Sequence, residues 1–273
     1  MQREELLKKI KKIEIASSIL AREIFSGRYR SWFKGNGLEF SDIRLYAPGD
    51  DVKKIDWKVS ARQRKTYVKE FTEEREICIY VLVDLSGSDA FPAKMDLIYQ
   101  LVGSLALSAH KNGDKVALLL FTSRVERYIP PKKGRNHAML VLDALLNHRP
   151  AEKGTSIRTA LEFLNSVMKK RGIVFLISDF LDAGYEQMLS VIAAKHDLIP
   201  IKIGDKKYEK LPKGAIFTLE DAESGRRVVM ENEGRDVYIG GDTGPRLLKI
   251  DTDDNYIVTL SNYFSRRRRG MRL

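Results

Sequence analysis

From residue 77 to residue 203, short apolar runs alternate with longer segments of helical periodicity. Strands are expected at residues 77–83, 115–121, 173–178 and 197–203, with a shorter one near 125–129. Helices are expected at about residues 92–111, 135–147, 156–170 and 184–195. Strands that are apolar throughout are buried on both faces, which is typical of a mostly parallel sheet. We therefore expect an α/β fold in which helices cover both faces of that sheet.

The ends of these elements carry helix-stop signals, and a second pattern follows the last strand. Gly113 and Gly172 come after expected helices, where glycine commonly ends a helix. Residues 217–219 and 227–230 flank the turn-forming run 221–225, which predicts a hairpin. A last helix is expected within residues 244–265.

The chain before residue 76 has a different character. Apolar residues recur at helical spacing up to Gly27, which predicts a docking helix, with a short coiled coil or adsorption to a membrane surface as weaker alternatives. Residues 28–75 form an irregular accessory segment with turn signals, in which residues 66–71 alternate like an edge strand. The expected boundaries are a helix at 1–27, the accessory segment at 28–75, the α/β domain at 76–204, a hairpin and helix at 205–264, and an Arg-rich tail at 265–273.

Charge and composition exclude several classes of protein. The formal net charge is +11, and much of the surplus lies in Lys8–Lys12, Arg62–Lys65 and Arg266–Arg269. Such clusters attract nucleic acid or acidic membranes, but a solvated face and a frayed tail explain them more simply. No apolar run is long enough to span a membrane, and the charged N-terminus does not resemble a signal peptide, so a cytoplasmic protein is expected. The single cysteine, Cys78, lies within the first apolar strand, where it is expected to pack as a small hydrophobic residue.

Oxygen-bearing side chains occur where the expected strands end. They are Asp84, Ser86, Ser88, Thr155 and Asp179. Ligands of open α/β sheets bind outside the carboxyl ends of the strands, so these five side chains are expected to converge. Hydroxyl and carboxylate oxygens suit Mg²⁺, Mn²⁺ or Ca²⁺, whereas zinc would recruit histidine or cysteine. None of the four histidines has metal-ligand spacing with another, and the sequence therefore predicts a magnesium-type site.

The series Asp84-x-Ser86-x-Ser88, Gly154-Thr155 and Ser178-Asp179 resembles the metal-ion-dependent adhesion site of von Willebrand factor type A domains. The resemblance implies that Ser86, Ser88 and Thr155 contact the metal directly, and that Asp84 and Asp179 act through water. It also implies that an acidic side chain of a partner docks at the open position of the metal. A turn in which Ser86–Ser88 cap the following helix is the alternative for the first motif alone.

A second resemblance lies upstream of these residues. The runs Gly37–Tyr46, Pro48–Asp51, Ile55–Trp57, Ser60–Arg62 and Lys69–Phe71 resemble the signature block of the prokaryotic "domain of unknown function 58" family. This resemblance implies a von Willebrand factor A-like domain and an adaptor or chaperone-like role beside a MoxR-type AAA+ ATPase. The aromatic residues of the block are expected to fill a small core. Its charged residues Asp50, Asp51, Asp56 and Arg62 form a possible partner surface.

Three alternatives stay open. Asp89 either adds a third carboxylate near the metal or caps the helix that begins at Pro92. The favoured function is a noncatalytic, metal-dependent protein-interaction module, and a polyanion-binding protein is the alternative. A metal-dependent hydrolase is disfavoured because the sequence has no phosphate-cradling loop and no second aspartate two positions after Asp84.

Overall fold

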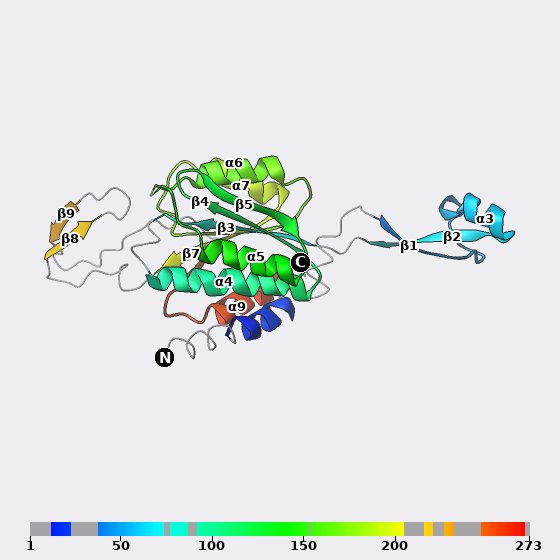
Figure 1. The fold of residues 1–273 in the computed structure, drawn as a ribbon, viewed down its shortest axis with the longest axis horizontal. Coiled ribbons are helices and arrows are strands. Elements are labelled where there is room, and N and C mark those ends of the chain that lie inside the picture. The colour runs from blue at the N-terminus through cyan, green and yellow to red at the C-terminus, as the bar shows by residue number, and fades with distance from the viewer. Residues whose placement is uncertain are drawn as a thin grey trace.

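The computed structural model describes residues 12–22, 38–73, 77–86, 92–152, 154–204, 216–220, 227–231 and 247–270. In chain order the named elements of these residues (Figure 1) are β1 (Leu38–Leu45), η1 (Val52–Lys54), α3 (Trp57–Gln63), β2 (Tyr67–Glu73), β3 (Cys78–Asp84), α4 (Pro92–Lys111), β4 (Lys115–Phe121), β5 (Val125–Lys132), α5 (Arg135–Leu146), α6 (Ile157–Val167), β6 (Ile173–Ser178), α7 (Glu186–Lys195), β7 (Asp197–Gly204), β8 (Ile216–Glu220), β9 (Arg227–Glu231), β10 (Leu248–Asp251) and α9 (Tyr256–Gly270).

A six-stranded sheet forms the centre of the molecule, in the order β10-β7-β6-β3-β4-β5. All neighbouring pairs are parallel except β4 and β5, which are antiparallel. The expected mostly parallel sheet is thus confirmed. Because β3 lies between β6 and β4, the residues that follow these three strands meet at one edge of the sheet.

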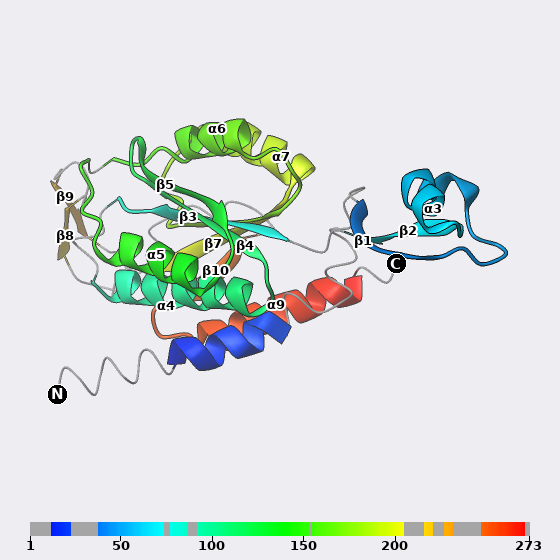
Figure 2. The same cartoon turned by 45° about the vertical axis from the view of Figure 1, so that its right-hand side comes forward.

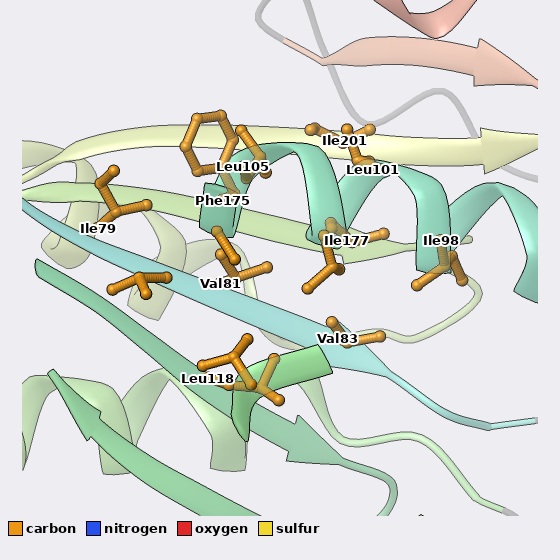
Figure 3. Close-up of a cluster of buried hydrophobic side chains, with 14 of the residues drawn as sticks. Ile79, Val81, Val83, Ile98, Leu101, Leu105, Leu118, Phe175, Ile177 and Ile201 are labelled. Carbon is orange, nitrogen blue, oxygen red and sulfur yellow. The ribbon is translucent and has the colours of Figure 1, made fainter. Parts of the chain in front are cut away.

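Alternate residues of β3 face two separate hydrophobic cores. Ile79, Val81 and Val83 point to the side covered by α4 (Figure 3), where they join one buried cluster. Tyr80 and Leu82 point the other way, into a cluster with residues of α6 and α7. Both faces of the sheet are therefore covered, which explains why the strands are apolar at every position.

The two ends of α4 follow from local sequence. Pro92 occupies its first position, where the missing N–H costs no hydrogen bond and the fixed φ suits a helix. Gly113 follows with φ +71, the left-handed conformation that commonly ends helices. Gly172 does not act in this way, because α6 already ends at Val167. A Cβ at Gly172 would instead lie 2.4 Å from the carbonyl oxygen of Cys78, so glycine permits close packing there.

A helix of residues 12–22 packs near α4 and α9 (Figure 2). Its Ala16 and Leu20 are fully buried. The Ser108 hydroxyl of α4 donates to the Ser17 carbonyl at 2.9 Å, and the Lys111 ammonium donates to the Ser17 hydroxyl at 2.8 Å. In the described residues this segment is therefore a docking helix.

The end of the chain differs from expectation in two respects. Residues 248–251, expected to lie before or within a helix, form β10, which pairs in parallel with β7. Four residues are too short a run for periodicity to reveal a strand. The helix α9 then continues to Gly270, through the run Arg266–Arg269 that was expected to fray. Arg267 donates to the Asp197 carboxylate at 2.6 Å, which holds this turn of the helix against the sheet.

Replacing Arg267 is expected to test this contact. Only 1% of the Asp197 side chain is exposed, so Arg267→Gln removes a cation from a buried carboxylate. The free energy of unfolding should fall by about 2 kcal/mol, measured by urea denaturation. The neighbouring exposed Arg266 supplies the control, because Arg266→Gln should change stability by less than about 0.5 kcal/mol. Equal effects of the two substitutions would show that the ion pair contributes nothing.

The accessory segment forms a small antiparallel pair, β1 with β2, joined by η1 and α3. Asp56 caps α3, because its carboxylate accepts from the N–H groups of Lys58 and Val59. The expected strand at 66–71 is present as β2, and the pair stands apart from the central sheet in both views (Figures 1 and 2). A separate pair, β8 with β9, corresponds to the expected hairpin.

Candidate metal site

Asp84 is the last residue of β3, and its carboxylate is held by hydroxyl groups from two strand ends. Its Oδ1 accepts from the Ser86 hydroxyl at 2.7 Å and from the Ser86 N–H at 2.9 Å. Its Oδ2 accepts from the Ser178 hydroxyl, at the end of β6, at 2.6 Å. The two neighbouring strands therefore fix Asp84 in one orientation at the carboxyl edge of the sheet.

Burial makes this carboxylate unusually basic. Asp84 is 6% exposed, and desolvation raises its pKa from 3.8 to about 7. The hydrogen bonds from Ser178 and Ser86 lower the pKa and the nearby Asp179 carboxylate raises it, but desolvation is the largest effect. A bound cation would favour the ionised form, so the residues fit a site for a positive ion.

Asp179 follows β6 on a loop that is held firmly in place. Its Oδ1 accepts from the Leu181 N–H at 3.2 Å, and its Oδ2 lies 3.6 Å from the Lys94 ammonium of α4. Phe180, the next residue, is only 3% exposed. Its φ of 58 is a left-handed conformation that costs a non-glycine residue energy. Its N–H donates to the Ser178 hydroxyl at 2.9 Å, so one serine joins Asp84 to the Asp179 loop.

Thr155 lies on the loop before α6, which is tied to the ends of both neighbours of β3. The Ser156 N–H donates to the carbonyl of Thr122, after β4, at 2.9 Å. The Ile157 N–H donates to Asp182, after β6, at 2.8 Å. These two contacts hold the Thr155 loop over the same edge of the sheet as Asp84 and Asp179.

The possible ligands are thus hard oxygen groups. Asp84, Ser86 and Asp179 share the edge, and the Thr155 loop lies beside them, whereas Ser88 and Asp89 lie outside the described residues. Within the described residues, no group of three or more His, Cys, Asp or Glu side chains could hold a metal ion. The hydroxyl and carboxylate oxygens at this edge are of the kind that hold divalent cations.

Three contacts at this edge were not anticipated from the sequence. Ser178 was part of the Ser-Asp motif, but its hydroxyl bridges Asp84 and the Phe180 N–H, which no spacing reveals. Lys94 pairs with Asp179 across 85 residues of sequence. Asp182 had only one signal, an acidic residue in the loop after a strand. Its carboxylate accepts from the N–H of Ile157, the first residue of α6, 25 residues earlier in the chain.

Asp182 is expected to position the Thr155 loop. Asp182→Ala removes the acceptor of the Ile157 N–H and should lower stability by about 1 kcal/mol. If the loop helps to hold a metal, the variant should also bind Mn²⁺ about tenfold more weakly, as loss of an outer-shell contact usually does. Calorimetric titration with Mn²⁺ measures the affinity. The control is Asp143→Asn on the exposed side of α5, which should bind Mn²⁺ like the wild type.

The charged residues of the accessory segment have structural contacts of their own. Asp50 accepts two hydrogen bonds from the Arg44 guanidinium, both at 2.7 Å, and its pKa is lowered to about 2, mainly by that contact. Asp51 accepts from the Lys53 N–H, and Asp56 caps α3. Arg62 is exposed in the last turn of α3. A partner-binding role for these four residues stays a prediction, and the three carboxylates also stabilise the loop that contains them.

The described residues contain no helix that combines the length and the apolar character needed to cross a membrane. Comparison with curated proteins finds an uncharacterised protein of Mycobacterium bovis that is 28% identical over 269 residues, covering 90% of this chain and 85% of that protein. The protein YeaD of Bacillus subtilis, also uncharacterised, is 31% identical over 97 residues, covering 36% of this chain and 23% of that protein.

Solved structures similar to this one include a conserved hypothetical protein BatB from Bacteroides thetaiotaomicron, with 12% identity and a TM-score of 0.47, covering 70% of this chain and 98% of that chain. They also include proximal thread matrix protein 1 from the mussel byssus with a zinc-occupied MIDAS motif, with 19% identity and a TM-score of 0.40, covering 48% and 38%. A family model described as "Protein of unknown function DUF58" matches residues 42–238. This match spans most of the chain, and the chain therefore belongs to the DUF58 family.

Proposed function

We propose that this protein is a noncatalytic, metal-dependent protein-interaction module that docks an acidic side chain of its partner on a magnesium-type ion. The observation that carries the proposal is the buried Asp84 carboxylate, held by the Ser86 and Ser178 hydroxyls at the carboxyl edge of the sheet. A carboxylate in this setting is costly to ionise without a cation. Its position next to Asp179 supports a role in holding one.

Different residues of this chain would hold the ion and contact the partner. Asp84, Ser86 and Asp179, with Thr155 and Ser88, would hold the ion, and the ion would supply a positive charge for a carboxylate of the partner. Leu181 is 56% exposed on the rigid loop after Asp179, where it offers the partner an apolar contact. The loop is fixed by three hydrogen bonds, so little conformational entropy is lost when a partner binds.

The identity of the ion and of the partner form the finer part of the proposal. We take Mg²⁺ as the resident ion, because the oxygen ligands match its preference. We take a MoxR-type AAA+ ATPase as the partner, on the family resemblance of the signature block. Catalysis is not part of this proposal, because the sequence has no phosphate-cradling loop.

A pull-down with the MoxR-type ATPase encoded nearest to the gene tests the proposal directly. Binding should be at least tenfold stronger in Mg²⁺ than in chelator, Asp84→Ala should lose that difference, and Asp143→Asn should keep it. Leu181→Ala should weaken binding in Mg²⁺ severalfold without changing Mn²⁺ affinity. Equal binding in Mg²⁺ and in chelator would contradict the metal-dependent role.

A further inference from the structure

The far end of the accessory segment exposes large apolar side chains. We call residues 45–66, the connection from β1 to β2 with its η1 and α3, the tip. Trp57 is 69% exposed, Val52 is 59% exposed and Leu45 is 51% exposed, and Tyr46 is also exposed. A two-stranded sheet with one short helix is too small to bury them. Exposed tryptophan is uncommon on a surface with no partner.

The acidic residues of the tip are engaged by the tip itself and by the strands β1 and β2 that carry it. Asp50 accepts from Arg44 and from the Ala47 N–H, and Asp51 accepts from the Lys53 N–H. Asp56 accepts from two N–H groups of α3 and lies 3.5 Å from the Lys69 ammonium. The three carboxylates of the tip therefore serve to fix its shape.

The basic residues of the tip have no such contacts. The tip contains six basic side chains and three acidic ones, and the basic ones are Lys53, Lys54, Lys58, Arg62, Arg64 and Lys65. Among the described residues, none of the six forms an ion pair within 4 Å or a side-chain hydrogen bond, although the Lys54 charge contributes to the lowered pKa of Asp50. The surface that the tip presents to solvent is therefore both basic and apolar.

We propose that the tip is a docking surface for an acidic protein segment that encloses Trp57 in an apolar pocket. Its unpaired cations complement a negatively charged partner. Tryptophan, tyrosine and arginine are the residues that most often dominate protein interfaces, and Trp57, Tyr46 and Arg62 are all exposed here. The ion pairs of Arg44 with Asp50 and Glu70 keep the tip rigid. A rigid surface favours binding to a protein of one complementary shape over nonspecific binding to phosphate groups.

The tip is remote from the candidate metal site. β2 leads through residues 74–77 to the first residue of β3, whereas Asp84 is the last residue of β3. The tip projects away from the body of the molecule (Figure 1). Binding at the tip therefore needs no metal and no contact with Asp84. The proposal stands even if the edge of the sheet binds no ion.

Selection of displayed random dodecapeptides on the immobilised full-length chain, carried out in chelator, tests the proposal. Enriched peptides should contain aspartate or glutamate beside a large apolar residue. Fluorescence anisotropy with labelled copies of these peptides should show at least tenfold weaker binding to Trp57→Ala and to the pair Lys53→Glu with Lys54→Glu. Trp57→Phe should recover most of the affinity. Leu146→Ala, which changes another exposed apolar residue at the end of α5, should bind like the wild type.

Two further probes separate an acidic protein from other polyanions. Phosphatidylglycerol vesicles and a single-stranded oligonucleotide should show no binding that depends on Trp57. Far-UV circular dichroism should show that every variant folds, as expected for exposed positions. The proposal would be overturned if the enriched peptides were neutral or basic, or if their enrichment did not depend on Trp57. It would also be overturned if only the vesicles or the oligonucleotide bound in a Trp57-dependent way.

Discussion

At pH 8, Mg²⁺ is expected to raise the melting temperature of this protein by about 5–10 °C over its value in chelator, and Asp84→Asn is expected to remove the whole increase. A ligand present at 100 times its dissociation constant stabilises the folded state by about 2.7 kcal/mol, which corresponds to a shift of this size. Scanning fluorimetry in Mg²⁺ and in chelator measures it. The Asp143→Asn variant should keep the full increase.

The pH dependence of this effect has a definite direction. Burial raises the pKa of Asp84 to about 7 in the folded chain, from an ordinary value of 3.8. Between these values the folded state holds a proton that the unfolded state has released, so metal-free stability falls as the pH rises from about 4 to 7. The full loss above pH 7 amounts to about 4 kcal/mol, since each pKa unit is worth about 1.36 kcal/mol.

Metal and protons should therefore compete at Asp84. The increase in melting temperature with Mg²⁺ should be large at pH 8 and small at pH 5, where Asp84 is protonated. In chelator at pH 8, Asp84→Asn should be more stable than the wild type, because it buries no charge. A Mg²⁺ effect of equal size at both pH values, or one that survives Asp84→Asn, would show that the ion binds elsewhere.

Gly172→Ala is expected to produce the largest loss of stability, about 3–5 kcal/mol, or about 10 °C in melting temperature. An added Cβ would lie 2.4 Å from the Cys78 carbonyl oxygen and 2.8 Å from the Met168 side chain. The side chain of Met168 could move, but the carbonyl belongs to the first residue of β3 at the centre of the sheet. The backbone would have to shift there, at a cost typical of overpacked cores.

The control for this substitution is another glycine with ordinary surroundings. At Gly154 an added Cβ would lie 3.6 Å from the Ser123 Cβ, which is normal contact, so Gly154→Ala should cost less than about 1 kcal/mol. Chemical denaturation in chelator compares the two variants. Similar losses would contradict the prediction, because the close approach to the Cys78 carbonyl exists at Gly172 and not at Gly154.

Elements with a strong local pattern could be predicted from the sequence. The strands β4 and β6 and the helix α4 have the predicted bounds, because runs buried on both faces are apolar throughout and Pro92 and Gly113 mark the ends of α4. β10 was missed because four residues show no periodicity. The Arg267 ion pair was missed because its partner lies 70 residues away in sequence.

The candidate site divides in the same way. Asp84, Ser86 and Asp179 could be proposed because each ends a recognisable strand, and parallel strands bring such ends together. The contacts of Ser178, Lys94 and Asp182 join segments that are distant in sequence, so they depend on the folded sheet. The structural contacts of Asp50, Asp51 and Asp56 were also hidden, because an acidic residue in a turn looks the same whether it caps a helix or binds a partner.

The docking of residues 12–22 near α4 and α9 has a consequence for the order of folding during synthesis. The Lys12 ammonium lies 5.5 Å from the centre of the Tyr256 ring, so an early segment and a late segment of the chain meet over the same helix. This layer can form only after the ribosome has synthesised α9. Until then, the apolar face of α4 that this layer covers stays exposed, and the nascent chain offers chaperones a binding surface that the finished protein lacks.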